Sequence, residues 1–218
     1  MAGIQITTAP TVEPITLQEA KEHLRLDDSA DERILQRYIE TARRFAEEYT
    51  KRSLSQQTIS FFADAYDELA DPLFEGVKTG PYLNYYKNYI VLPRPPVISV
   101  TSVSTFADDD TETTFAASKY FVDNVREPAR VVLRLGESFP TALRVANAIK
   151  VVYSAGYSSV YDIPEPIRIG ILQHVAHLYE HRGDMYDAIT PFPKQLKSLY
   201  APYVVHEGLG SSSIMAIG

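Results

Sequence analysis

The chain of 218 residues contains no cysteine and no tryptophan. The absence of cysteine excludes a disulfide scaffold, a thiolate zinc site, an iron–sulfur cluster and a cysteine nucleophile. We therefore expect an intracellular protein that depends on its core, which at this length buries roughly 70% of the surface of the unfolded chain. Long apolar runs are also missing: no stretch reaches the eighteen or so residues of a membrane helix. The first ten residues lack the basic cluster of a signal peptide.

Positive charge is scarce as well. There are 21 Lys and Arg against 28 Asp and Glu, which gives a formal charge of −7. This balance argues against a nucleic-acid-binding module, because phosphate neutralisation needs clustered basic residues. Gly136 and Gly156 stand alone, so there is no phosphate-binding glycine loop, and Ser154-Ala155-Gly156 is not a nucleophile elbow. We predict no catalytic residue, no metal ligand and no cofactor.

One histidine cluster keeps an enzyme alternative open. His174, His177 and His181 recur at spacings of three and four residues beside Glu180, so a helix would place them on one side. The order lacks the His-Glu-x-x-His arrangement of a zinc protease, and the histidines flank an apolar stripe. We favour a structural role and keep a metal-binding enzyme as the alternative, with a nucleic-acid-binding module as a second one.

Helical periodicity dominates both ends of the chain. Thr16 and Glu19 fit a capping box, which predicts a short helix ending near Leu26. A longer amphipathic helix follows the acidic break 27–31 and extends to about residue 52. Asp162, as a cap, and Pro164 and Pro166, as first-turn residues, predict a third helix running to Arg182, and a last short helix is expected over 194–200.

Between these helices the apolar period changes to two, which is typical of strands. We predict six short strands in a modest sheet, at 58–63, 89–92, 98–106, 120–122, 130–135 and 148–154. A bulge is expected near Thr101 and Ser102, and Pro93–Pro96 should form a rigid corner outside the ladder. Asp108–Glu112 is acidic but lacks the spacing of a calcium loop, so we expect a hairpin tip.

This order predicts an α+β fold in which two N-terminal helices and a C-terminal helix form a helical core with an inserted antiparallel β region. We expect the N-terminal helical part to cover 1–57, the β domain with its long tyrosine-rich loop 58–160, the C-terminal helical part 161–200 and an extended tail 201–218.

Two segments are candidates for contacts with other molecules. Four of the 15 tyrosines crowd into eight positions, and large amphipathic rings suit a subunit or next-ring interface: Tyr82, Tyr85, Tyr86 and Tyr89. Packing of these rings on their own sheet is an equal alternative. The segment 193–217 combines linker composition with a small apolar tip, so we expect it to dock on a partner through Leu196, Tyr200, Tyr203, Ile214, Met215 and Ile217. A chain truncated after Asp184 should then still fold.

Five segments in this order resemble the head-tail connector family of tailed bacteriophages, also called head-completion or adaptor proteins. They are Ile15–Leu26, the helix ending in Arg43–Arg52, Leu92–Val97, Val152–Tyr157 and Ile163–Arg182. The similarity spans roughly residues 15–183. The chain departs from the common pattern in its long 64–88 segment and in the extension after Asp184.

The resemblance implies a structural virion protein and no enzyme. Members form rings of typically twelve copies under the portal, with a stopper or tail-completion protein below. Double-stranded DNA passes through their channel without specific binding. It also implies location in the virion, at the head-tail connector, after assembly in the host cytoplasm. The net charge of −7 per copy agrees with a conduit, because acidic walls repel phosphates weakly and do not hold them.

Overall fold

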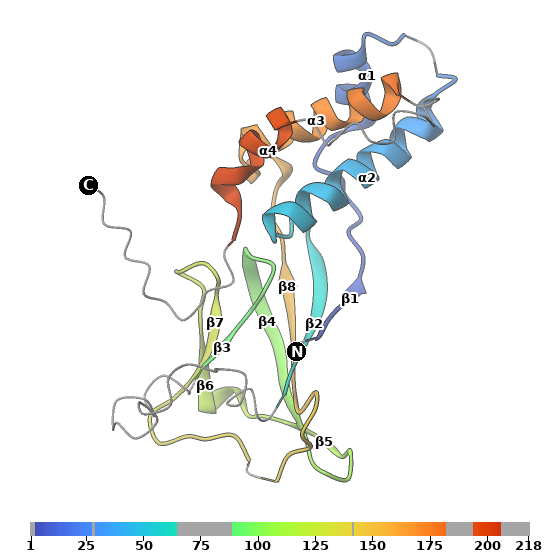
Figure 1. Cartoon of the computed structure of the whole chain (residues 1–218). Coiled ribbons are helices and arrows are strands. Elements are labelled where there is room, and N and C mark those ends of the chain that lie inside the picture. The colour runs from blue at the N-terminus through green and yellow to red at the C-terminus, as the bar shows by residue number, and fades with distance from the viewer. Residues whose placement is uncertain (1–2, 28, 65–88, 141, 182–193, 206–218) are drawn as a thin grey trace, which may run out of the picture.

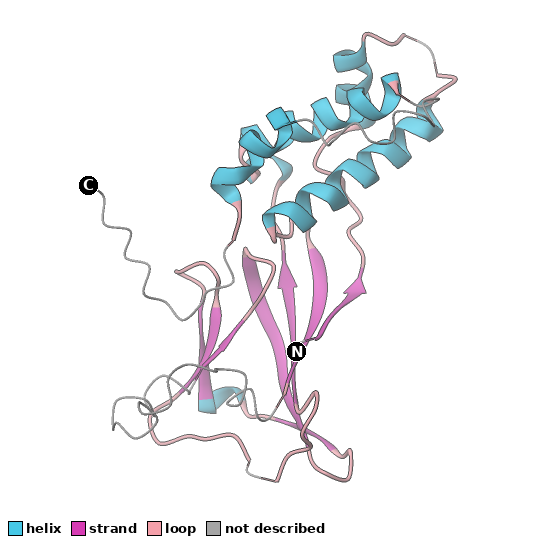
Figure 2. Cartoon of the chain, in the orientation of Figure 1, coloured by secondary structure: helices cyan, strands magenta, loops and turns pink. Residues whose placement is uncertain are grey.

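The computed structural model describes residues 3–27, 29–64, 89–140, 142–181 and 194–205. Within these ranges it contains four α-helices and eight strands, so the predicted α+β class is confirmed. Helices gather at one end of the molecule and strands at the other (Figure 1, Figure 2). None of the helices in the described ranges has the length and apolarity to cross a membrane.

The two N-terminal helices form where the sequence predicts them. Helix α1 spans Leu17–Leu24, and the capping box at its start is complete because Thr16 and Glu19 each accept from the other's backbone N–H. Helix α2 spans Glu32–Thr50 and buries one stripe, which includes Leu35, Ile39 and Ala42. Both helices end on a residue in the left-handed conformation.

The C-terminal helices pack on this pair. Helix α3 spans Glu165–Glu180, and α4 spans Lys194–Tyr200. The N-cap of α3 is Pro164, so the prediction that Asp162 caps this helix was wrong; Asp162 ends the preceding 3-10 turn, Val160–Asp162. Ile15, Leu35 and Ile39 from the N-terminal side share one core with Ile167, Ile171 and Tyr200 from the C-terminal side. The chain therefore leaves the helical core, builds the β part and returns.

The β part consists of two sheets, where the sequence predicted one. The five-stranded sheet has the order β1-β2-β8-β4-β5, and the three-stranded sheet has the order β3-β7-β6. The strand bounds are β1 Gly3–Thr8, β2 Gln57–Ala63, β3 Tyr89–Val91, β4 Val97–Phe106, β5 Glu112–Thr114, β6 Tyr120–Asp123, β7 Arg130–Leu133 and β8 Ile149–Ala155. All ladders are antiparallel.

The two sheets enclose a second core. Ile59, Phe61, Val103, Val151 and Tyr153 of the larger sheet pack with residues of the smaller one, which include Tyr120, Val131 and Leu133. The six predicted strands are present, but β1 and β5 were missed. The register of β4 against β8 shifts between Val100 and Ser102, which confirms the predicted bulge. The β4–β5 turn contains Asp108–Asp110, as expected for a hairpin tip.

Hydrogen bonds at the Pro93–Pro96 corner join the two cores. The Ser53 N–H donates to the Pro95 carbonyl at 3.0 Å, and the buried Tyr153 hydroxyl donates to the Pro93 carbonyl at 2.6 Å. Arg94 reaches α2, where it donates to the Glu47 carbonyl at 3.0 Å and pairs with the Glu48 carboxylate. The predicted rigid corner is thus the junction between the helical core and the β part.

Candidate functional surfaces

The three histidines on α3 lie in different environments. His174 is buried and meets the ring of Phe45 edge-on at a centroid distance of 5.2 Å. His177 and His181 lie one turn apart near the end of the helix, with ring centroids 4.3 Å apart, and Nδ1 of His181 is 2.9 Å from the His177 carbonyl. Burial, with a smaller contribution from His177, lowers the pKa of His174 to about 4.

This placement supports the structural interpretation of the cluster. His174 packs in the helical core, so it does not share an open position with His177 and His181. In the part of the chain that the structure describes, no three His, Cys, Asp or Glu side chains are grouped to hold a metal ion.

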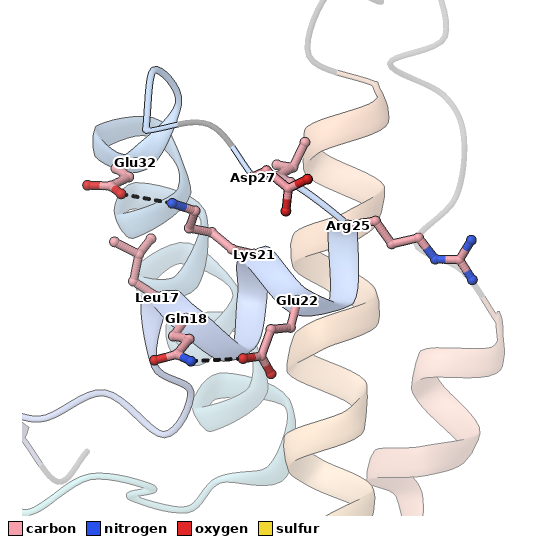
Figure 3. Close-up of a pocket in the computed structure, with 8 residues that line it drawn as sticks. Leu17, Gln18, Lys21, Glu22, Arg25, Asp27 and Glu32 are labelled. Carbon is pink, nitrogen blue, oxygen red and sulfur yellow. Dashed lines mark hydrogen bonds and ion pairs between the residues drawn. The ribbon is translucent and has the colours of Figure 1, made fainter.

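A wide surface hollow of about 720 Å³ lies between α1 and the start of α2. Its lining is mostly polar and charged: Leu17, Gln18, Lys21, Glu22, Arg25, Leu26, Asp27 and Glu32. Lys21 Nζ pairs with Glu32 at 2.9 Å and Gln18 donates to Glu22 at 2.9 Å, while Arg25 points away from these pairs (Figure 3). The charged groups largely neutralise one another, which gives the hollow no focused field for a substrate.

Of the four tyrosines predicted to form an interface, only Tyr89 lies in the described residues. It begins β3 and is half-buried, and the guanidinium of Arg130 on the adjacent strand β7 lies 5.3 Å from the centre of its ring. Tyr82, Tyr85 and Tyr86 fall outside the described residues.

Of the six residues predicted to dock on a partner, three lie in the described residues and three lie outside them. Leu196 and Tyr200 are fully buried in the helical core, so their side chains are not available on the surface of the folded chain. Tyr203 is half-buried and packs against the same core. Ile214, Met215 and Ile217 lie outside the described residues. The expectation that a chain truncated after Asp184 still folds is therefore revised, since that truncation would remove part of a core.

Exposed apolar side chains on the β part are further candidates for contacts with other molecules. Ile4 and Ile6 on β1 are 45% and 55% exposed, and Val91 on β3 and Phe121 on β6 are 40% and 46% exposed. Strand β1 was not predicted from the sequence, although Gly3–Thr8 alternates with a period of two. This alternation is the signal in the sequence that indicates the strand.

The family model of the phage gp6-like head-tail connector protein matches residues 14–92. These residues cover α1, α2, β2 and β3. No curated protein matches the chain.

Solved structures extend the similarity to nearly the whole fold. A chain from the neck of an empty GTA particle, computed with C6 symmetry, has a TM-score of 0.72 and 20% identity, over 95% of this chain and 98% of the other. A chain from the virion of a native gene transfer agent (GTA) particle has a TM-score of 0.69 and 19% identity, over 95% and 97%. A chain from the neck of a native GTA particle, computed with C12 symmetry, has a TM-score of 0.67 and 20% identity, over 95% and 98%.

The resemblance predicted from the order of the segments is therefore confirmed for residues 14–92, the part that the family model matches. In sequence over residues 14–92 the chain is similar to phage head-tail connector proteins, and in fold over 95% of its length it is similar to neck and virion chains of GTA particles.

Proposed function

We propose that this chain is a structural virion adaptor, a head-tail connector that binds the portal as a homo-oligomeric ring and extends the DNA channel toward the tail. The observation that carries the proposal is the likeness to neck chains over 95% of the fold, together with the family match at residues 14–92. The proposal places the mature protein in the virion after assembly in the host cytoplasm.

The symmetry of the similar necks supports a ring of copies. These necks were computed with C6 and with C12 symmetry, and a ring of twelve identical chains satisfies both. In this arrangement the portal lies on one side of the ring and a stopper or tail-completion protein on the other.

The charge of the chain suits a channel that lets DNA slide. A charge of −7 on each copy gives a ring a net negative field, which disfavours tight phosphate binding. Double-stranded DNA therefore passes through without specific contacts in this proposal.

The placement of the three histidines on α3 also agrees with a structural role. The histidine cluster that kept the enzyme alternative open is divided between the core and the surface, because His174 packs against Phe45. No other observation favours that alternative or the nucleic-acid-binding module.

The C-terminal tail, which the sequence predicts to dock on a partner, is the proposed contact with the portal. Because Leu196 and Tyr200 belong to the core, we assign the docking to the apolar tip with Ile214, Met215 and Ile217, which follows a glycine- and serine-rich stretch.

Deletion of the gene for this chain from the particle that encodes it tests the function. We expect DNA-filled heads that carry no tails, and restoration of joined particles when the chain is supplied from a plasmid. Joined particles that eject their genome without the chain would overturn the proposal, as would turnover of a substrate by the purified chain.

A further inference from the structure

The open edge of the larger sheet carries an apolar strip that continues the β core. Strand β1 is the first strand of the order β1-β2-β8-β4-β5, and within the described residues no strand pairs with its outer side. Ile4 pairs with Phe61 and Ile6 pairs with Ile59, both of which are buried in the β core. Residues paired directly across an antiparallel ladder share a face, so Ile4 and Ile6 lie on the core-facing side of the sheet.

The two isoleucines are nevertheless about half exposed. Their partners on β2 pair in turn with Val151 and Tyr153 of β8, and both of these residues are fully buried. Burial is thus complete in the middle of the sheet and lost at β1. We name Ile4 and Ile6 the edge patch.

Nothing in β1 itself protects this edge. Gly3–Thr8 contains no charged residue and no proline, the residues that usually keep exposed edge strands from pairing with other chains. Its ladder to β2 stays regular through Ile6, and the register shifts only after that residue. Exposed apolar side chains therefore lie on a strand whose outer side pairs with no other strand among the described residues.

A second apolar surface covers the outer face of the three-stranded sheet. Phe121 pairs with Val132, and Val132 pairs with Tyr89 on the other side, so all three residues share one face. The alternate residues of β7, Val131 and Leu133, are buried in the β core, so this face points away from it. We name Tyr89, Val91 and Phe121 the sheet patch.

Two arginines lie beside the rings of the sheet patch. Arg130 pairs with Asp123 at 2.8 Å and also lies over the Tyr89 ring, and the Arg134 guanidinium lies 6.0 Å from the centre of the Phe121 ring. The Arg130 charge is neutralised by Asp123, so the Tyr89 ring can bury apolar area beside a paired cation.

The two patches lie on different sides of the β part. Figure 1 shows β1 at the right of the strands and the three-stranded sheet β3-β7-β6 at the left. A contact between different surfaces of two identical chains is heterologous, and it closes into a ring when the rotation between copies permits. A patch that packed only against its own counterpart would give a dimer and no ring.

We propose that the edge patch of one copy packs on the sheet patch of the next copy, and that this contact is part of the ring interface. The inference rests on the proposed function, because the cyclic symmetry of the similar necks makes a second copy the expected neighbour. The partner surface is thus the outer face of β3 and β6 of an identical chain, presenting Tyr89, Val91 and Phe121.

Crosslinking tests the contact directly, since the natural chain has no cysteine. A tagged chain with Ile6→Cys and Phe121→Cys is assembled into particles and treated with a short bismaleimide. We expect a ladder of chain multimers that ascends to the closed ring. The single variants Ile6→Cys and Phe121→Cys are the controls and should give no ladder.

A second pair of variants tests the contact without crosslinking. Ile4→Lys combined with Ile6→Lys should keep the thermal unfolding temperature, because both side chains are exposed, and should reduce incorporation into necks roughly tenfold or more. Gln5→Lys adds charge to the opposite face of the same strand and should incorporate normally.

The outcomes separate this inference from the proposed function. Absence of the wild-type chain from necks would overturn the proposed function itself. Presence of the chain in necks without a ladder from the double cysteine variant would overturn only the interface, as would normal incorporation of the lysine double variant. If the lysine variant fails to fold, the crosslinking result decides.

Discussion

At the scale of single residues, His174 shows how a polar side chain can belong to a core. It lies on the α3 stripe with Ile167, Ile171 and Val175 and packs edge-on against Phe45 of α2. Burial holds its pKa at about 4 in the folded chain, whereas an unfolded chain would titrate near 6.5. Between these two values the unfolded state binds more protons, so acid favours unfolding.

We predict that the chain loses stability as the pH falls from about 6.5 toward 4, by on the order of 3 kcal/mol from this residue. His174→Leu should remove this part of the pH dependence, since no proton is then taken up on unfolding. Urea unfolding at pH 7 and pH 4 measures it, with His181→Leu, an exposed position, as the matched control. An unchanged slope in the His174→Leu chain would contradict the assignment.

At Gly170, the structure shows why a residue without a side chain is needed. A Cβ at this position would lie 2.5 Å from the ring of Tyr200, which is fully buried. We predict that Gly170→Ala destabilises the chain by about 1–3 kcal/mol by displacing α4. Gly3→Ala is the control, because its Cβ would meet only ordinary contacts at 3.7 Å. Thermal unfolding of the two variants should differ clearly; equal melting temperatures would contradict the tight α3–α4 contact.

At the scale of elements, several helices, a bulge and a turn could be predicted from the sequence because the signal for each lies within a few neighbouring residues. The capping box at Thr16 and Glu19, the stripe of α2, the bulge near Ser102 and the proline corner all depend on residues within one segment. Asp162 was assigned as a cap for the same local reason, but the chain enters α3 through Pro164.

Other features depend on contacts between distant segments. The three residues of β5 carry no periodicity of their own and pair only because the hairpin brings them beside β4. The division into two sheets follows from which strands neighbour one another, and β8 lies between β2 and β4 although it follows both in sequence. The candidate docking residues could not be judged from local sequence either, because the burial of Leu196 and Tyr200 arises from packing against α2 and α3.

The C-terminal helix gives a prediction at this scale. A chain ending after Val205 keeps α4 and should unfold at the wild-type temperature. A chain ending after Asp184 loses the buried Leu196 and Tyr200, so it should lose more than about 3 kcal/mol of stability. Circular dichroism during thermal unfolding measures both; equal stability of the two truncated chains would show that α4 does not complete the helical core.

At the scale of the whole molecule, a buried ion-pair network fixes the helical core to the β part. The Glu47 carboxylate accepts from Arg43 at 2.7 Å and from the Leu54 N–H at 2.9 Å, and Arg43 also pairs with Glu13. Arg94 from the proline corner donates to the Glu47 carbonyl. Because Leu54 lies between α2 and β2, the network sets the direction in which the β part leaves the helices.

We predict that Glu47→Ala costs about 3–5 kcal/mol, since it leaves the buried Arg43 with fewer partners and the Leu54 N–H without its acceptor. Glu48→Ala, which removes an exposed pair with Lys51 and Arg94, should cost less than about 1 kcal/mol. Chemical denaturation compares the two variants. A small effect of Glu47→Ala would mean that the junction is held by the backbone hydrogen bonds of the corner alone.

We propose that many copies of this chain join the portal as a ring. The most direct measurement is the mass of the purified portal ring before and after addition of the chain. We predict an added mass that is a whole-number multiple of 24.5 kDa and corresponds to a complete ring of copies. No added mass, or the mass of a single copy, would contradict assembly of a ring on the portal.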